Sequence, residues 1–385
     1  MLSKFFLTAT PFLVLLLLSF KSPKTFIKQE NTPPQLVKSN SKIQVALLLD
    51  VSNSMDGLIN QAKDQLWTMV KVLGKVQCNG INPQIEIALY EYGRSSNSAD
   101  KGYVKQIEPF TSDLDKLYNS LYQLSTQGGE EYCGYVIKTS LDELSWDTTQ
   151  GSYKAIFIAG NESFQQGSIS FTHACAEAKL KKVIVNTIYC GKRERGIQDN
   201  WELGAECGNG SFTNIDQDAI HIPVPSPYDT TLYVLNTKLR NTLLPYGNIP
   251  EYDTVPEYNT RQIDKIIGYV VVKSDKNLYN RNQWDLVDAA EKDNSIIDKV
   301  DMTLLPDSLQ TKPRSYIKKL VQQKSDEREL IRKEIKRLDL LRDSFIKQAR
   351  MAKDMPKTLE SVIENIIRNQ VGRVNMKMVE NTKGF

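Results

Sequence analysis

Residues 43–55 of this chain read IQVALLLDVSNSM, an apolar run that ends abruptly in a carboxylate and two hydroxyl side chains. A near-continuous apolar run of this length is typical of a β-strand that is buried on both faces of a sheet. The carboxyl end of such a strand would bring Asp50, Ser52 and Ser54 into one loop. Apolar residues recur at helical spacing over 58–73, so we expect a helix there, with Ser54 or Asp56 as its N-terminal cap.

The chemistry of this loop favours a metal ion. Asp50, Ser52 and Ser54 carry short oxygen-bearing side chains at alternate positions. Oxygen donors held on a rigid strand-to-helix turn suit a hard divalent cation, and Mg²⁺ is the best match.

Strands and helices alternate over the first half of the chain. This alternation predicts an α/β fold with a doubly wound, mainly parallel sheet that is covered on both faces. Ligands of such sheets bind beyond the carboxyl ends of the strands, where Asp50 and Asn161 both fall. The expected strands after the first are 84–92, 103–110, 153–159, 183–189 and 211–215, with helices near 111–124, 137–146, 170–181 and 197–206.

The run from Asp50 to Ser54 resembles the D-x-S-x-S signature of von Willebrand factor A (VWA) domains. The similarity extends from about residue 42 to about residue 222 and includes the order of strands and helices. It implies a VWA, Rossmann-like fold of the bacterial envelope type. In that family, a metal-ion-dependent adhesion site (MIDAS) holds a divalent cation that leaves one coordination position for a carboxylate of a protein partner.

The resemblance also implies a set of metal ligands, from which this chain departs at two positions. The family uses the signature Asp and two Ser, matched by Asp50, Ser52 and Ser54, together with a Thr and a second Asp. The Thr position, after a double glycine, is Glu130 here, and the second Asp corresponds to Asn161. The two exchanges leave the formal charge of the ligand set unchanged. Alternatively, Glu130 caps the following helix and the metal is lost, or Asn161 caps loop backbone.

The resemblance therefore predicts a non-enzymatic, metal-dependent adhesion or scaffold module of the cell envelope. The sequence has no P-loop pattern, no G-x-S-x-G and no H-E-x-x-H. Two alternatives stay open. One is a structural envelope scaffold with a vestigial metal site. The other is a metal-dependent hydrolase that uses Glu130 or Glu131 as its general base.

The N-terminus predicts export. Lys4 precedes an apolar run over 5–20, which is shorter than a membrane-spanning helix and fits a signal peptide or an anchor over 1–21. The alternative is a buried core helix. Residues 22–41 contain several Pro and Lys residues and predict a tether between the membrane and a domain at 42–225. We expect a periplasmic or membrane-anchored protein whose folded part lies outside the cytoplasm.

Composition limits the other classes of function. The net charge of +3 gives no case for nucleic-acid binding. The two histidines, His173 and His221, are too few for a His-rich zinc site. Five cysteines are compatible with export, and Cys190 and Cys207 bracket a short segment that a disulfide could close. Free or buried thiols are the alternative, since connectivity cannot be deduced from sequence.

Beyond residue 225 the pattern becomes helical. Residues 226–313 predict a connecting region with short helices, including one at 228–244 that packs back on the sheet domain. Residues 314–385 predict a coiled-coil-like region, with a long helix over 315–355 and a final helix that begins near 359. The narrow apolar seam of the long helix fits either an intramolecular helical hairpin or self-association with another chain.

Overall fold

The computed structural model of the chain describes residues 41–215, 224–247, 263–276, 278–279, 281–353 and 359–379. The predicted signal peptide or anchor lies outside the described residues, as does the predicted tether apart from Ser41. Among the described helices, none is both long enough and apolar enough to span a membrane.

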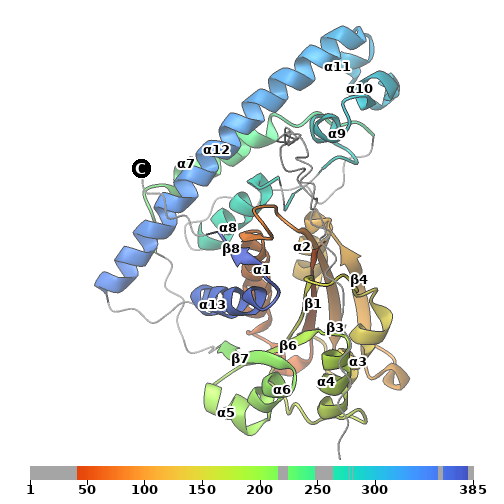
Figure 1. The fold of residues 1–385 in the computed structure, drawn as a ribbon, viewed down its shortest axis with the longest axis vertical. Helices are drawn as coiled ribbons and strands as arrows, with labels where there is room; N and C mark the ends of the chain where they lie inside the picture. Colours follow the sequence, from red (N-terminus) through yellow and green to blue (C-terminus); the bar gives the residue numbers. More distant parts are fainter. Residues whose placement is uncertain are drawn as a thin grey trace, which may run out of the picture. The chain divides into compact units, whose positions relative to one another are not determined.

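A six-stranded sheet has the order β4-β3-β1-β5-β6-β7 (Figure 1). Neighbouring strands are parallel, except that β4 runs antiparallel to β3. The predicted α/β class with a doubly wound, mainly parallel sheet is therefore confirmed. The order reverses between β1 and β5, which is where ligands of such sheets bind. The strands are β1 (Lys42–Asp50), β3 (Gln84–Tyr92), β4 (Lys105–Thr111), β5 (Tyr153–Gly160), β6 (Ile184–Cys190) and β7 (Asn209–Ile215).

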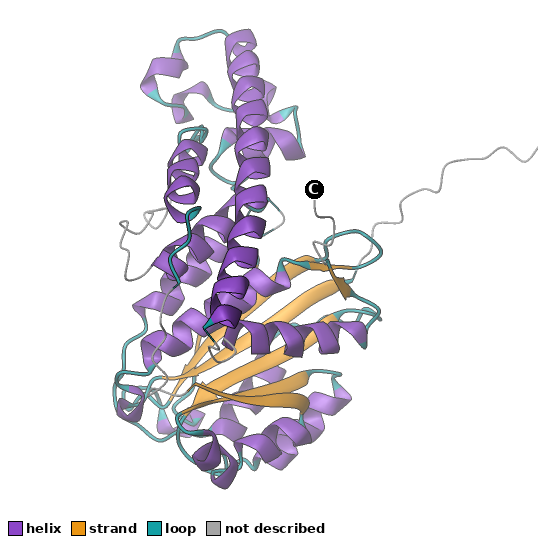
Figure 2. Ribbon diagram, turned by 90° about the vertical axis from the view of Figure 1, so that its left-hand side faces the viewer, coloured by secondary structure: helices purple, strands orange, loops and turns teal. Residues whose placement is uncertain are grey.

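Alternate side chains of β1 enter two hydrophobic cores, one on each face of the sheet (Figure 2). Val45, Leu47 and Leu49 pack with α1 (Ile59–Leu73) and α2 (Leu114–Gln123). Ala46 and Leu48 pack in the other core. The helices of that second core are α3 (Cys133–Glu143), α4 (Phe171–Leu180) and α6 (Trp201–Cys207), and the short α5 (Arg193–Gln198) precedes α6.

The first helix begins later than the sequence predicts. A 3-10 turn (Asn53–Met55) follows β1, and the N-cap residue of α1 is Leu58, which makes no side-chain cap. The expected capping by Ser54 or Asp56 is therefore wrong. The Ser54 hydroxyl is bonded to other side chains of the loop and the Asp56 carboxylate to Thr126, so neither satisfies the backbone of α1.

The C-terminal residues complete the first core. Helix α13 (Leu359–Gly372) packs on α1, and β8 (Lys377–Met378) pairs with β2 (Val76–Gln77) beside it. Helix α7 (Asp229–Arg240) was expected to pack on this domain, but its apolar side chains lie against α8 (Ile263–Ser274) and α12 (Arg314–Ala352). Helix α13 reaches the sheet beside α1, whereas α8 packs on α1 from outside.

The long helix α12 packs within its own chain. It contacts α7, α8, α9 (Leu286–Lys292) and α10 (Ile296–Lys299) in turn (Figure 1). Two apolar clusters line this contact, and between them lies Arg328, which is buried. The seam thus packs on helices of the same chain, but not as the expected hairpin with the next helix, because α13 packs on α1. A 3-10 turn (Met302–Leu304) and α11 (Asp307–Gln310) lead into α12.

Candidate metal site

The carboxyl ends of β1, β3 and β5 meet loop 126–131 at the point where the strand order reverses. Val51 N donates to Tyr92 O at 2.9 Å, and Gln127 N donates to Val51 O at 2.7 Å. Ser95 N donates to Gly128 O at 2.6 Å. These backbone bonds fasten loop 126–131 to the ends of two strands and so hold its side chains beside the end of β1.

Asp50 is the centre of the site. Its side chain is fully buried, and its Oδ1 accepts a hydrogen bond of 2.8 Å from Ser52 N. Its Oδ2 is also buried and has no hydrogen-bond partner within the described part of the chain. A buried carboxylate oxygen without a partner is costly, so such an atom indicates a missing ligand.

Two glycines make room for this carboxylate. A Cβ at Gly93 would lie 2.9 Å from Asp50 Oδ1, and a Cβ at Gly160 would lie 3.0 Å from Asp50 Oδ2. Gly93 also has a φ of +82°, which disfavours any side chain. The space around both carboxylate oxygens therefore depends on glycine at the ends of β3 and β5.

The hydroxyls and the amide form a connected set of oxygen donors. Ser52 Oγ and Ser54 Oγ share a hydrogen bond of 2.8 Å. Ser54 Oγ donates to Asn161 Oδ1 at 2.8 Å, and Asn161 Nδ2 donates back to Ser54 O at 2.8 Å. The structure thus brings together Asp50, Ser52, Ser54 and Asn161, four of the five predicted ligands.

The fifth predicted ligand, Glu130, is exposed, and no hydrogen bond joins it to the other four among the described residues. Its neighbour Glu131 is 8% exposed, and its carboxylate is buried near Ser52 and Asp50. Sequence reasoning named Glu131 only as an alternative general base. Both acids follow the double glycine, so the only signal for Glu131 is its position immediately before α3.

Negative charge gathers at the site. The pKa of Asp50 is raised to about 7, mainly by burial, with hydrogen bonds from Ser52 lowering it and the carboxylates of Glu131 and Glu162 adding smaller increases. Burial likewise raises the pKa of Glu131 to about 6. Neither carboxylate forms an ion pair with a Lys, Arg or His in the described ranges. The charge of an ionised Asp50 is therefore left uncompensated by protein cations.

The predicted disulfide between Cys190 and Cys207 is not formed, and both thiols are free. Cys190 ends β6 with its thiol buried near Asp50, and burial raises the pKa of that thiol. Cys207 ends α6, where its thiol lies near that of Cys175 on α4. The two cysteines bracket a short segment, but their side chains face different neighbours.

The donor set fits a hard divalent cation. Neighbouring ligands around octahedral Mg²⁺ are about 3 Å apart, close to the 2.8 Å between Ser52 Oγ and Ser54 Oγ and between Ser54 Oγ and Asn161 Oδ1. The described residues contain no group of three or more His, Cys, Asp or Glu side chains able to hold a metal. The site combines two carboxylates with neutral hydroxyl and amide oxygens instead.

No family model matches the chain, and no curated protein matches it in sequence. Several solved structures are similar to it. An aerotolerance-related membrane protein from Bacteroides fragilis is 18% identical over 46% of this chain and 96% of its own, with a TM-score of 0.33. A von Willebrand factor type A protein from Catenulispora acidiphila is 12% identical over 46% of this chain and 39% of its own, with a TM-score of 0.34.

A third similar structure is proximal thread matrix protein 1 from the mussel byssus, with a zinc-occupied MIDAS motif. It is 13% identical over 47% of this chain, with a TM-score of 0.35, and the chain covers 43% of the length of the mussel protein. VWA domains are thus among the solved structures that this chain resembles.

Proposed function

We propose that the candidate metal site around Asp50 binds a divalent cation, Mg²⁺ being the best match, and presents it to a carboxylate of a protein partner. The observation that carries the proposal is the buried Asp50 Oδ2, which lacks both a hydrogen-bond donor and a protein cation within the described residues. The chain would then be a non-enzymatic, metal-dependent binding module.

The proposed ligands of the cation are of two kinds, charged and neutral. Asp50 and Glu131 supply the negative charge that a divalent cation requires, and the hydroxyls of Ser52 and Ser54 supply neutral oxygens. Asn161 holds the Ser54 side chain and backbone through two hydrogen bonds, so it orients that ligand and offers its own Oδ1. A bound cation with an open coordination position attracts an anionic group from a partner.

Two features favour binding over catalysis. The thiols of Cys133 and Cys190, near Asp50, are fully buried, so a substrate could not reach them. The hydroxyls of Ser52 and Ser54 hydrogen-bond to each other, and that of Ser54 also to Asn161, and neither bonds to a histidine within the described residues. His173 lies on α4, where its side chain is exposed and pairs with Glu177 at 3.3 Å.

The proposal includes location. An apolar stretch over 5–20 followed by a Pro-rich tether supports export, with the N-terminus at the membrane and the folded part outside the cytoplasm. A cation site at the edge of the sheet would then face the medium from which a protein partner binds. A reporter fused after Phe385 that works only in the cytoplasm should be inactive.

Calorimetric titration of the full chain with Mg²⁺ and Mn²⁺ tests the cation site. Asp50→Asn should abolish binding, whereas Asp100→Asn, an exposed control in a 3-10 turn (Ala99–Lys101), should bind as the unaltered chain does. A cation at hundredfold excess over its Kd should add about 2.7 kcal/mol to the free energy of unfolding. Equal titrations of Asp50→Asn and the unaltered chain would contradict the proposal.

Capture of partner proteins tests the second part of the proposal, that the bound cation is presented to a protein partner. The full chain should retain a partner in Mg²⁺ and release it in EDTA, and Asp50→Asn should retain none in either buffer. Retention by Asp50→Asn equal to that of the unaltered chain would show that another surface binds the partner.

A further inference from the structure

A second feature lies in the contact between the sheet domain and the long helix. A cavity of about 610 Å³ opens between α1, α8 and α12. This volume lies in the range of pockets that hold small organic molecules. Its apolar wall includes Val271, Leu278 and Leu340, and Gly74 approaches so closely that a Cβ there would lie 2.4 Å from Leu278.

The charged wall of this cavity has an excess of cations. Six Lys or Arg side chains and four Asp or Glu side chains line it. Some of them neutralise each other, since Lys333 pairs with Glu329 at 2.9 Å and Lys71 lies 3.6 Å from Asp339. Lys276 and Lys336 have no ion pair within 4 Å among the described residues. The cavity is therefore suited to an anion.

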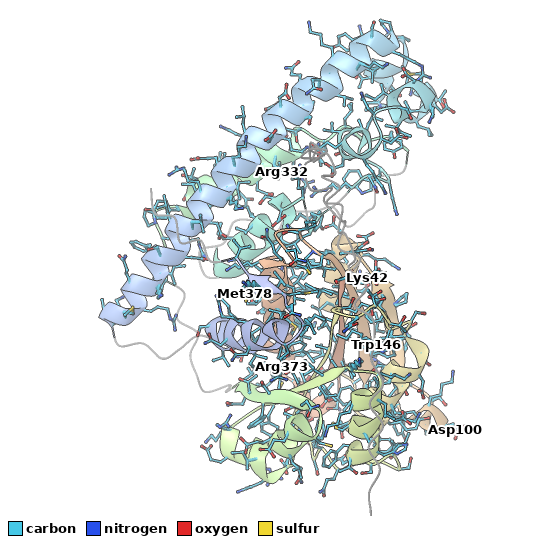
Figure 3. All side chains as sticks on the ribbon, viewed as in Figure 1. Lys42, Asp100, Trp146, Arg332, Arg373 and Met378 are labelled. Carbon is cyan, nitrogen blue, oxygen red and sulfur yellow. The ribbon has the colours of Figure 1, made fainter. Side chains whose placement is uncertain are left out.

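Arg332 is the most informative residue of this wall (Figure 3). Its side chain is 11% exposed, and its terminal nitrogens make only loose ion pairs, at 3.4 Å with Asp288 and 3.9 Å with Glu291. Its Nε is buried and finds no hydrogen-bond acceptor in the described parts of the chain. A buried guanidinium N–H without an acceptor is unfavourable, and carboxylate or phosphate oxygens match its geometry.

One further polar atom faces the same space. Asp339 Oδ1 is buried and accepts no hydrogen bond from a described residue, although Lys71 lies near it. Arg332, Lys336 and Asp339 lie on one face of α12, and Arg332 and Asp339 are about 10 Å apart along the helix axis. A ligand with an acidic group at one end and a hydrogen-bond donor at the other would satisfy both atoms.

We propose that this cavity is a binding site for a small, soluble organic anion that carries a phosphate or carboxylate group and an apolar body. Arg332, with Lys336 and Lys276 nearby, binds the acidic group, and the wall formed by Val271, Leu278 and Leu340 packs on the apolar body. The site is independent of the cation site and of any partner bound there, because it is built from α1, α8 and α12.

Titration of the full chain with phenyl phosphate tests this proposal, with inorganic phosphate and phenol as the two halves of that probe. We expect one-to-one binding of phenyl phosphate, weaker binding of inorganic phosphate and none of phenol. Arg332→Gln should weaken phenyl phosphate about tenfold or more, the loss of a hydrogen bond to a charged group. The control is Lys347→Gln, which alters an exposed lysine on the same helix but outside the cavity. This variant should bind phenyl phosphate as the unaltered chain does.

Lys336→Gln keeps the test decisive if the Arg332 variant does not fold, because Lys336 is exposed at the rim and makes no ion pair among the described residues. It should weaken phenyl phosphate several-fold while leaving Mg²⁺ binding unchanged. No binding of phenyl phosphate by the full chain would overturn the proposal. Equal affinities of the Lys336 and Lys347 variants would overturn it as well.

Discussion

Asn186 and Gln370 form two hydrogen bonds with each other in the buried core, although 184 residues separate them in the chain. Gln370 Nε2 donates to Asn186 Oδ1 at 2.6 Å, and Asn186 Nδ2 donates to Gln370 Oε1 at 3.2 Å. Tyr153 Oη donates to the same Gln370 oxygen at 2.7 Å. The C-terminal helix α13 is thereby fixed to β5 and β6, so the last helix of the chain completes the sheet domain.

We expect Gln370→Ala to destabilise the whole fold. It leaves the side chains of Asn186 and Tyr153 without their partner in a buried place, at a cost of about 1–3 kcal/mol for each unsatisfied group. Asn369→Ala removes an amide from the exposed side of the same helix and should change the free energy of unfolding by less than about 0.5 kcal/mol. Urea denaturation of both variants measures this difference, and equal midpoints would contradict the docking of α13.

This core explains how far the sequence could predict the fold. The apolar run before Asp50 predicts a strand buried on both faces, and the alternating pattern after it predicts a mainly parallel, doubly wound sheet, whereas the strand order is known only from the structure. The apolar positions of α7 and α13 predict two helices equally well. They do not say which helix covers the sheet, because any apolar stripe can pack on any other. The buried amide of Gln370 is what selects α13, and its partners are visible only in three dimensions.

The candidate site, too, could be predicted from the sequence only in part. Asp50, Ser52 and Ser54 follow one strand, so their meeting could be predicted from the end of that strand alone. The choice between Glu130 and Glu131 depends on the path of the loop before them. Gly129 approaches so closely that a Cβ there would lie 2.3 Å from Gly93 O, and this packing turns Glu131 inward. The disulfide predicted from the spacing of Cys190 and Cys207 is not formed for a related reason, because spacing along the chain carries no information on side-chain direction.

Arg328 offers a test of the helical region. It is buried and holds Asp285 and Asp288 on α9 at 2.5 Å each, and it donates to Thr242 Oγ1 at 2.9 Å. Arg328→Met should cost about 3–5 kcal/mol, because the buried Asp285 loses its counter-ion and Asp288 keeps only the looser pair with Arg332 at 3.4 Å. Arg337→Met, which breaks an exposed pair with Glu334, should leave the free energy of unfolding almost unchanged.

Chemical denaturation of these two variants, together with a Mg²⁺ titration, measures both effects. The cation affinity should stay unchanged in each variant, since both residues are on α12 and neither contacts the site. A stability loss for Arg337→Met as large as for Arg328→Met would show that burial of the pair is not the cause.

The raised pKa of Asp50 predicts how stability changes with pH when no divalent cation is present. Asp50 has a pKa of about 7 in the folded chain against an ordinary value of 3.8, so the folded state binds more protons than the unfolded state between these values. In EDTA, the contribution of this group is fully present below about pH 4 and is lost as the pH rises through 7. Asp50→Asn should show a smaller loss over this window.

Urea unfolding at pH 5 and pH 8 in EDTA measures the difference between the two proteins. Saturating Mg²⁺ should restore the stability of the unaltered chain at pH 8, because a cation favours the ionised carboxylate, and should leave Asp50→Asn unchanged. A pH dependence in EDTA that is identical in both proteins would show that Asp50 is not the titrating group.

Glu130 and Glu131 give the sharpest test of the proposed ligand set, because they are adjacent and chemically identical. Glu131 is buried near Ser52 and Asp50, whereas Glu130 is exposed. If Glu131 provides a carboxylate ligand to the cation, Glu131→Gln should weaken Mg²⁺ binding about tenfold or more, while Glu130→Gln should leave it within about twofold. Each tenfold loss corresponds to about 1.4 kcal/mol of binding free energy.

A second substitution separates a ligand from a merely structural residue. Asn161→Asp returns a carboxylate to the same edge of the sheet, so it should tighten Mg²⁺ binding and rescue much of the loss in Glu131→Gln. Two ligands of one ion must couple in a double-mutant cycle, whereas independent sites add. Calorimetric affinities of the two single variants and the double variant decide between these cases. A reversed pattern, with Glu130→Gln weakening Mg²⁺ and Glu131→Gln not, would return the ligand role to Glu130 and require the loop to rearrange when the cation binds.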